Sequence, residues 1–259
     1  MAMKSYRISR MEQYIIDKEH VSMEELCKVF DISINTCRLD VAELCSKGTI
    51  KKVYGGVSSI KENSLIPFEQ RKMTNSNIKK EIGREAAEIV EDGDIIFIDS
   101  GSTTMYILDY LTDKKNVTVI TNNLNAIVRG VQLPDVQIFC LPGTLDRRTN
   151  SFVTSDTAKT LARFNIKKAF IATAGISELG DVSNSSPLEF EVKRAAMAHS
   201  AKKYLVADSS KYGKSSLLNF TTLGEMDAFF TDDAIDRKAA IYCEQNKVRL
   251  VTACKGERR

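Results

Sequence analysis

A run of small polar residues after an apolar stretch is the first feature of this sequence that could do chemistry. The apolar stretch 95–98 predicts a buried strand, and after it come Asp99, Ser100, Gly101, Ser102, Thr103 and Thr104. We expect a hydroxyl-rich turn here and a helix that starts near Met105. Backbone amides and hydroxyls at such a helix start favour an anion. The run predicts a site for the phosphate group of a small metabolite, although the same residues could simply cap the helix.

Two further polar segments follow predicted strands and could complete this site. Thr121, Asn122 and Asn123 end one strand, and Lys211 lies just beyond another. Ligands of open parallel sheets bind at the carboxyl ends of the strands, so these segments could line one crevice. Lys211 could neutralise a phosphate, or it could be an ordinary solvated lysine. The glycine patterns of dinucleotide and nucleoside triphosphate sites are absent from the sequence.

A second set of polar residues lies on a predicted helix near the N-terminus. Ser33 is a good N-cap, and the outer face of the helix would carry Asn35, Thr36, Arg38 and Leu39. In a helix-turn-helix this end enters the major groove of DNA. There an arginine can pair with guanine through two hydrogen bonds, and an asparagine with adenine. The pattern indicates DNA binding, and a packing or dimerisation module is the alternative.

The segment after this helix predicts a β-ribbon. Gly48 ends the helix, and residues 49–56 form a short strand-like run that closes at Gly55 and Gly56. A ribbon at this place would be the wing of a winged helix, with Lys51 and Lys52 positioned for phosphate contacts.

The elements that must position these residues divide the chain into two domains. Residues 1–57 have helical patterns, including a capping box from Ser22 to Glu25, and 58–77 indicate a linker. From 78 to 259 apolar strands alternate with amphipathic helices, which is typical of an α/β domain with a mostly parallel sheet. The predicted strands are 94–99, 117–121, 136–141, 168–174, 203–208, 228–231 and 248–252.

Composition excludes several classes of protein. No apolar run reaches the length of a membrane span, and the polar start lacks the apolar core of a signal peptide. The net charge of +3 is too small to indicate nucleic-acid binding by itself. The six cysteines form no C-x-x-C pair and there are only two histidines, so we expect a reduced cytoplasmic protein without a metal or other cofactor.

The N-terminal motif resembles the DeoR family of bacterial transcriptional regulators. The run from Ile32 to Val57, I-S-I-N-T-C-R-L-D-V-A-E-L-C-S-K-G and later V-Y-G-G-V, is similar to the family signature. The resemblance implies a winged helix-turn-helix that binds operator DNA, with Tyr54 in its wing motif. One departure is Leu39, where the family has the second arginine of a pair.

The rest of the chain resembles the effector domain of the same family. The similar pieces are D-S-G-S-T-T, V-I-T-N-N, A-G-I, A-D-S-S-K-Y-G and F-F-T-D. The resemblance implies a fold like that of sugar-phosphate isomerases and a pocket that senses a phosphorylated sugar or sugar acid. The resemblance also implies that residues 99–104, residues 121–123 and Lys211 contact the effector. Pro142 and Thr154 depart from the family pattern near this pocket.

We therefore expect a ligand-controlled repressor of a carbohydrate or polyol catabolic operon, acting as a homodimer or homotetramer. K-V-Y-G-G-V-S-S-I and I-P-F-E-Q-R are similar to the family members that repress myo-inositol catabolism, which implies a phosphorylated intermediate of inositol breakdown as the effector. An isomerase-like enzyme with an added helical domain is the alternative, with Asp99 or Asp208 as its base. A DNA-binding protein with a vestigial sensor domain is a third interpretation.

Overall fold

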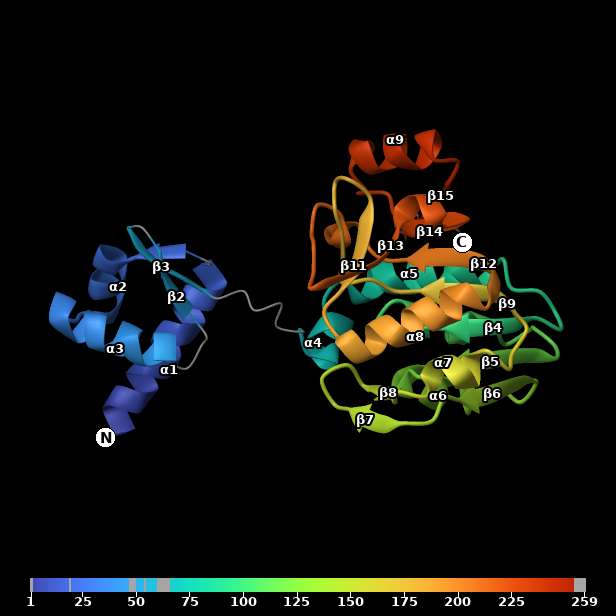
Figure 1. Cartoon of the computed structure of the whole chain (residues 1–259), viewed down its shortest axis with the longest axis horizontal. Helices are drawn as coiled ribbons and strands as arrows, with labels where there is room; N and C mark the ends of the chain where they lie inside the picture. Colours follow the sequence, from blue (N-terminus) through green and yellow to red (C-terminus); the bar gives the residue numbers. More distant parts are fainter. Residues whose placement is uncertain (1, 19, 47–49, 54, 60–65, 254–259) are drawn as a thin grey trace. The chain divides into compact units, whose positions relative to one another are not determined.

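The computed structural model describes residues 2–18, 20–46, 50–53, 55–59 and 66–253 of the chain (Figure 1). The chain divides into two compact units, residues 1–64 and 65–259. Each unit has its own hydrophobic core, so each is described by itself.

The first unit is a winged helix-turn-helix, as the sequence predicts. Its helices are α1 (Ala2–Lys18), α2 (Met23–Phe30) and α3 (Ile34–Ser46), and its strands are β1 (His20–Ser22), β2 (Ile50–Val53) and β3 (Gly56–Ser59). The strands form an antiparallel sheet in the order β1-β3-β2. The Ser22 side chain accepts a hydrogen bond from the Glu25 amide, which fixes the start of α2.

The predicted linker, 58–77, is partly folded. Helix α4 (Phe68–Met73) lies within it, and helix α5 (Ser76–Ala87) begins before its predicted end. Phe68 is buried in the core of the second unit, and its amide donates to the carbonyl of Arg148. The linker prediction is therefore wrong for this part, because burial of one aromatic side chain anchors a segment whose sequence is otherwise polar.

A seven-stranded parallel sheet forms the centre of the second unit. Its order is β15-β14-β12-β9-β4-β5-β6, and every neighbouring pair is parallel. All seven predicted strands are found, with small shifts at their ends: β4 (Ile95–Ile98), β5 (Val117–Thr121), β6 (Val136–Cys140), β9 (Ile166–Ile171), β12 (Ser200–Val206), β14 (Ala228–Asp232) and β15 (Arg249–Ala253).

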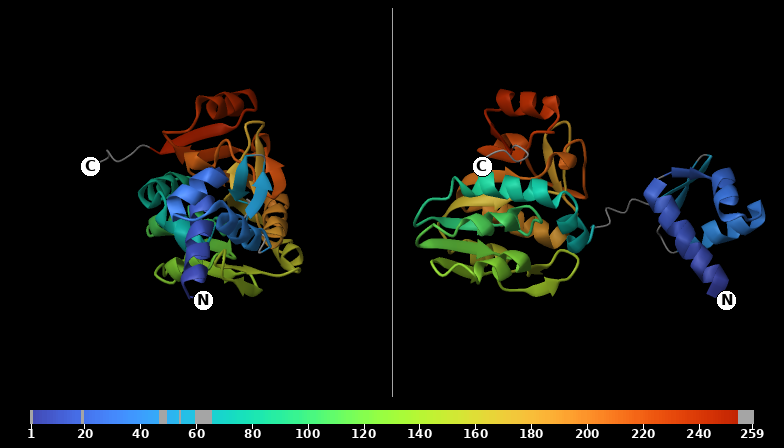
Figure 2. Two further views of the ribbon diagram at one scale, coloured as in Figure 1. Left: turned by 90° about the vertical axis from the view of Figure 1, so that its left-hand side faces the viewer. Right: turned by 180° about the vertical axis from the view of Figure 1, so that it is seen from behind.

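Helices cover both faces of this sheet (Figure 2). Side chains alternate along each strand, so that Ile96 and Ile98 of β4 pack on one face and Phe97 on the other. One face carries α5, the 3₁₀ helix η1 (Thr104–Tyr110) and α6 (Leu124–Gly130). The other carries α7 (Thr157–Leu161), α8 (Pro187–Ala198) and α9 (Arg237–Gln245).

Two small antiparallel sheets were not predicted from the sequence. The first pairs β7 (Thr144–Asp146) with β8 (Ser151–Val153). The second joins β10 (Gly175–Ile176), β11 (Asp181–Asn184) and β13 (Leu218–Thr222). Two further 3₁₀ turns, η2 (Ser209–Lys211) and η3 (Leu223–Glu225), lie near strand ends.

Candidate functional site

One face of α3 points away from the hydrophobic core of the first unit. Cys37, Val41 and Leu44 point inward and are fully buried. The opposite side chains, Asn35, Arg38, Leu39 and Ala42, are exposed. Their spacing of three and four residues places them along a single stripe of the helix. The side chains predicted to read bases therefore share one accessible surface.

The start of α3 is fixed by its own hydroxyl groups. The Thr36 amide donates to Ser33 Oγ at 3.2 Å, and the two side-chain hydroxyls lie 3.0 Å apart. This arrangement satisfies a free amide of the first turn. Ser33 is exposed and Thr36 is half-buried, and both lie at the helix end that would face DNA.

An ion pair that the sequence analysis missed holds α3 against α1. Arg7 Nε lies 2.8 Å from Asp40 Oδ2, and its Nη2 lies 3.3 Å from the other carboxylate oxygen. The Asp40 side chain is 1% exposed, and the hydrogen bond that Arg7 donates to it raises the pKa of Arg7. The aspartate within the R-L-D part of the motif is thus a structural residue, next to the exposed Arg38.

The predicted wing is present as the β2–β3 hairpin. Lys52 is exposed on it, and Lys51 lies in the same strand. Tyr54 lies outside the described residues. The DNA-contact role of all these residues stays a prediction.

The predicted effector residues of β4 and β5 lie together in the second unit. All of the residues from Asp99 to Thr104 and from Thr121 to Asn123 are buried. Asn123 Nδ2 donates to the carbonyls of Asp99 and Gly101, at 3.1 and 3.0 Å. The two turns therefore form one wall at the carboxyl ends of adjacent strands.

The hydroxyls of the first turn bond to protein groups, which differs from the predicted anion cradle. Thr104 Oγ1 donates to the carbonyl of Asp99 at 2.7 Å, and Ser100 Oγ donates to Glu189 at 2.6 Å. The helix expected near Met105 is present as a 3₁₀ helix that starts at Thr104. Thr104 tightens the turn by also accepting from the Gly101 amide, so the hydroxyls hold the wall in shape.

Three cationic side chains supply the positive charge at this end of the sheet. Lys79 of α5 is 2% exposed; its ammonium lies 3.2 Å from Ser102 Oγ and 3.9 Å from Asp208 Oδ2, and it also donates to the Arg71 carbonyl. Within the described part of the chain, the Lys211 ammonium has neither a hydrogen bond nor an ion pair. We refer to Arg71, Lys79 and Lys211 as the cationic cluster.

Burial and mutual repulsion lower the pKa values of the cationic cluster. The pKa of Lys79 is lowered to about 8, mainly by burial and also by the charges of Lys211 and Arg71, while the charge of Asp208 acts in the opposite direction. Burial also lowers the pKa of Lys211, and Arg71 acts in the same direction. For Asp208, burial opposes ionisation, but the Ser210 hydrogen bond and the charge of Lys79 outweigh it and lower the pKa. An anion between these cations would relieve their repulsion.

Helix α8 contributes a second pair of buried charges that sequence reasoning missed. Lys193 forms an ion pair with Asp99 and donates to the Ala172 carbonyl at 2.9 Å. Glu189, one turn earlier, accepts hydrogen bonds from Ser100, Ser151 and, at 3.4 Å, Asn184. Burial lowers the pKa of Arg71, against the attraction of Glu189 and then Asp99, so this arginine faces the same carboxylates.

Several buried polar atoms at this edge have no hydrogen-bond partner among the described residues. They are Arg71 Nη2, both side-chain polar atoms of Asn122, and Thr231 Oγ1. A buried polar atom without a partner costs about 1–3 kcal/mol. A ligand rich in hydroxyl and phosphate oxygens would supply the missing partners.

The residues that depart from the family pattern lie in the loops around β7 and β8. Pro142 is exposed, Thr154 is half-buried, and both Arg147 and Arg148 are exposed. Arg148 pairs with Asp146 only at 3.5 Å, with 71% of its side chain exposed. These arginines therefore behave as solvated surface residues.

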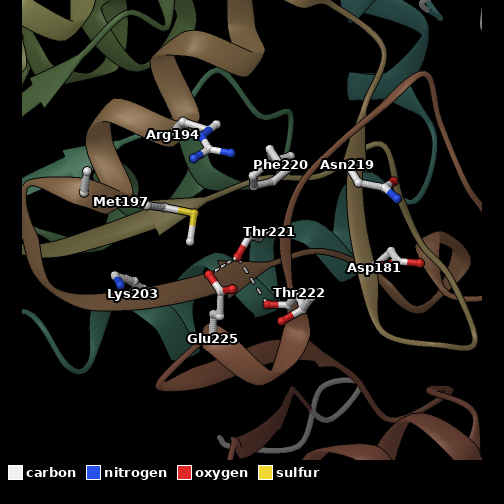
Figure 3. A pocket seen from close by; sticks show the side chains of 10 residues that line it. Asp181, Arg194, Met197, Lys203, Asn219, Phe220, Thr221, Thr222 and Glu225 are labelled. Carbon is white, nitrogen blue, oxygen red and sulfur yellow. Dashed lines mark hydrogen bonds between the residues drawn. The ribbon is translucent and has the colours of Figure 1, made fainter.

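A surface pocket of about 420 Å³ opens elsewhere on the second unit (Figure 3). It lies between α8, β11, β12 and β13 and carries two cations, Arg194 and Lys203, with two carboxylates, Asp181 and Glu225. Glu225 accepts a hydrogen bond from Thr221 at 2.9 Å. None of the predicted effector residues lines this pocket, whereas the buried edge holds them, so the buried edge is the better candidate for an anion.

The described residues contain neither a metal-ligand cluster nor a membrane-spanning helix. Among the described residues, no group of three or more His, Cys, Asp or Glu side chains could hold a metal ion. No helix in the described ranges is long and apolar enough to cross a membrane.

Each of the two units matches the model of a known domain family. A model of the DeoR-like helix-turn-helix domain matches residues 7–63, and a model of the DeoR C-terminal sensor domain matches residues 74–233. The transcriptional regulator IolR of Bacillus subtilis is 39% identical over 248 residues, which cover 96% of this chain and 99% of that protein. The glycerol-3-phosphate regulon repressor of Escherichia coli is 30% identical over 82% of this chain and 84% of its own.

Among solved structures, the fold is similar to ribose 5-phosphate isomerase A of Methanocaldococcus jannaschii. The TM-score is 0.39 at 16% sequence identity, covering 54% of this chain and 55% of that one. Both domain models and the full-length relatives agree on one assignment: the chain belongs to the DeoR family of helix-turn-helix transcriptional regulators.

Proposed function

We propose that this regulator represses a carbohydrate or polyol catabolic operon and leaves its operator when a phosphorylated sugar-type intermediate binds the second unit. The observation that carries the proposal is the cationic cluster beside the wall of residues 99–104 and 121–123. Asp99 pairs with Lys193, Asp208 lies near Lys79, and Glu189 attracts Arg71. Lys211 has neither a hydrogen bond nor an ion pair among the described residues, so we infer that its charge is the one available to a phosphate. Unpaired polar atoms of Asn122 and Thr231 could bond the hydroxyls of a sugar.

The relatives support a phosphorylated effector. One of them is named for a glycerol-3-phosphate regulon, and the sequence resembles repressors of myo-inositol catabolism. We therefore propose a phosphorylated intermediate of inositol breakdown as the first candidate. The protein would act in the cytoplasm as a homodimer or homotetramer, with one α3 in each half-site of a repeated operator.

The geometry gives less support to the enzyme alternative. A general base works best with a pKa near the operating pH. The pKa of Asp208 is lowered, because the Ser210 hydrogen bond and the Lys79 charge outweigh its burial. Asp99 is held by Lys193 and by the Ala172 amide. Both carboxylates are thus placed to hold cations and backbone in position.

A gel-shift titration on the promoter region beside the protein's own gene tests the proposal. It is run at fixed salt, since phosphate contacts make DNA affinity steeply salt-dependent, with and without a panel of sugar phosphates and inositol-pathway intermediates. We expect specific binding that one phosphorylated compound releases. Specific binding that no compound alters would contradict the sensor role, and turnover of a sugar phosphate would support the enzyme alternative.

The proposal predicts that effector affinity falls above pH 8. Lys79 has a pKa of about 8 in the free protein, whereas a bound phosphate would raise it, so binding at higher pH must take up a proton. The effector phosphate is already a dianion in this range. We expect the dissociation constant to rise by up to about tenfold per pH unit above 8.

Isothermal titration calorimetry at pH 7, 8 and 9 with the active phosphate ester measures this effect. Buffers of different ionisation heats report the proton uptake directly. The Lys79→Met variant should bind more weakly at pH 7 and lose most of the pH dependence. Equal affinities at pH 7 and 9 for the unaltered protein would show that Lys79 does not face the ligand.

A further inference from the structure

Leu39 is a large apolar side chain on the face of α3 that carries the predicted base contacts. It is 70% exposed, and it lies beside Arg38 and one turn from Asn35 and Ala42. The core of the unit is complete without it, since Cys37, Val41 and Leu44 fill the inner face of the helix. Leu39 therefore has no packing role in the described part of this unit.

The chemistry of the major groove limits what a leucine can contact there. Most features of the base edges in that groove are hydrogen-bond donors or acceptors, and the thymine C5 methyl is the largest apolar group among them. A leucine side chain has no donor or acceptor, so it cannot hydrogen-bond to a phosphate or to a base. In the groove it can make only apolar contacts.

We propose that Leu39 packs against the methyl group of a thymine in the operator and so fixes a T·A pair next to the pair contacted by Arg38. The proposal rests on the DNA-binding role of α3. Its neighbours support it, because Arg38 and Asn35 lie on the same exposed stripe and would hold the helix in register. Burial of Leu39 against the methyl removes apolar surface from water on both partners.

Replacement of thymine by deoxyuridine tests this contact, because it removes only the methyl group and leaves base pairing unchanged. The full chain first selects its operator from a pool of random duplexes. Each thymine of the selected half-site is then replaced singly, and the affinity is measured at fixed salt for the unaltered protein and for Leu39→Ala. We expect one thymine whose replacement weakens the unaltered protein about threefold to tenfold and leaves Leu39→Ala unaffected.

Two further variants sharpen the test. Val29→Ala removes another exposed apolar side chain, on α2 (47% exposed), and should keep the full sensitivity to deoxyuridine. Leu39→Arg, selected against the same random pool, should favour a different base at that one position. Because Leu39 is exposed, both of its variants should unfold at the temperature of the unaltered protein.

The outcomes separate this proposal from the function on which it rests. If no sequence is enriched, specific DNA binding fails and the Leu39 contact fails with it. If a sequence is enriched but no deoxyuridine weakens binding, or if Leu39→Ala keeps the same sensitivity, only the Leu39 contact is overturned.

Discussion

The Lys211→Met variant will stay bound to its operator at effector concentrations that release the unaltered protein. Half-release should require about 10- to 150-fold more effector, because a hydrogen bond to a charged group contributes about 1.5–3 kcal/mol. Lys211 suits this test, since its ammonium has neither a hydrogen bond nor an ion pair within the described residues, and Asp208 attracts it only through its charge. Removing it disrupts no internal bond, and burial already disfavours its charge, as its lowered pKa shows.

Lys214→Met is the matched control. Lys214 lies three residues further along and is exposed, so its replacement removes the same charge outside the cationic cluster. We expect normal release from this variant, and normal DNA affinity without effector from both. Calorimetry without DNA should show the same loss of effector affinity in Lys211→Met, because the lost contact would be made by the effector itself and does not depend on DNA. A Lys211→Met protein that is released normally would remove Lys211 from the effector site.

Local sequence patterns predicted most of the helix starts and central strands, because residues close together in the sequence determine these elements. The Ser22–Glu25 capping box needs only one helical turn. The seven strands follow from short apolar runs between polar turns, and in a parallel sheet covered on both faces such runs are buried. The small sheets of β7–β8 and β10–β11–β13 were missed because their strands are short and mix polar with apolar residues, as in D-V-S-N of β11, and so lack the apolar runs of the central strands.

The sequence predicted only those residues of the candidate site that lie at the ends of strands. Residues 99–104 and 121–123 came together because they follow adjacent parallel strands. Arg71 and Lys79 were missed because they belong to a polar stretch that only tertiary contacts, such as burial of Phe68, hold in place. The burial of Lys193 could have been predicted from the sequence. It lies beside Val192 and three residues before Ala196, two apolar positions of α8 that are fully buried.

The role of the hydroxyls could not be predicted from residue types. Ser100 and Thr104 have the composition of an anion-binding turn, yet their hydroxyls bond to Glu189 and to backbone groups. Glu189 is 89 residues away from Ser100 in the sequence, so no local pattern contains this pair. Which polar atoms remain free for a ligand depends on such distant partners.

Replacing Arg38 by alanine will weaken operator binding by about 5- to 150-fold, since two hydrogen bonds from arginine to one guanine are worth about 1–3 kcal/mol of discrimination. Arg38 is exposed on α3, whereas the neighbouring Asp40 is tied to Arg7, so the loss should come from the DNA contact and leave the fold intact.

The Arg38→Lys variant separates charge from base reading, because lysine keeps the positive charge but lacks the planar fork of arginine. We expect it to bind random DNA as the unaltered protein does and to lose most of the preference for the operator. Effector affinity should be unchanged in both variants, because the cationic cluster lies in the other unit. If Arg38→Lys binds the operator at full strength, Arg38 contacts only phosphates, and the sequence preference must come from Asn35, Leu39 or the shape of the DNA.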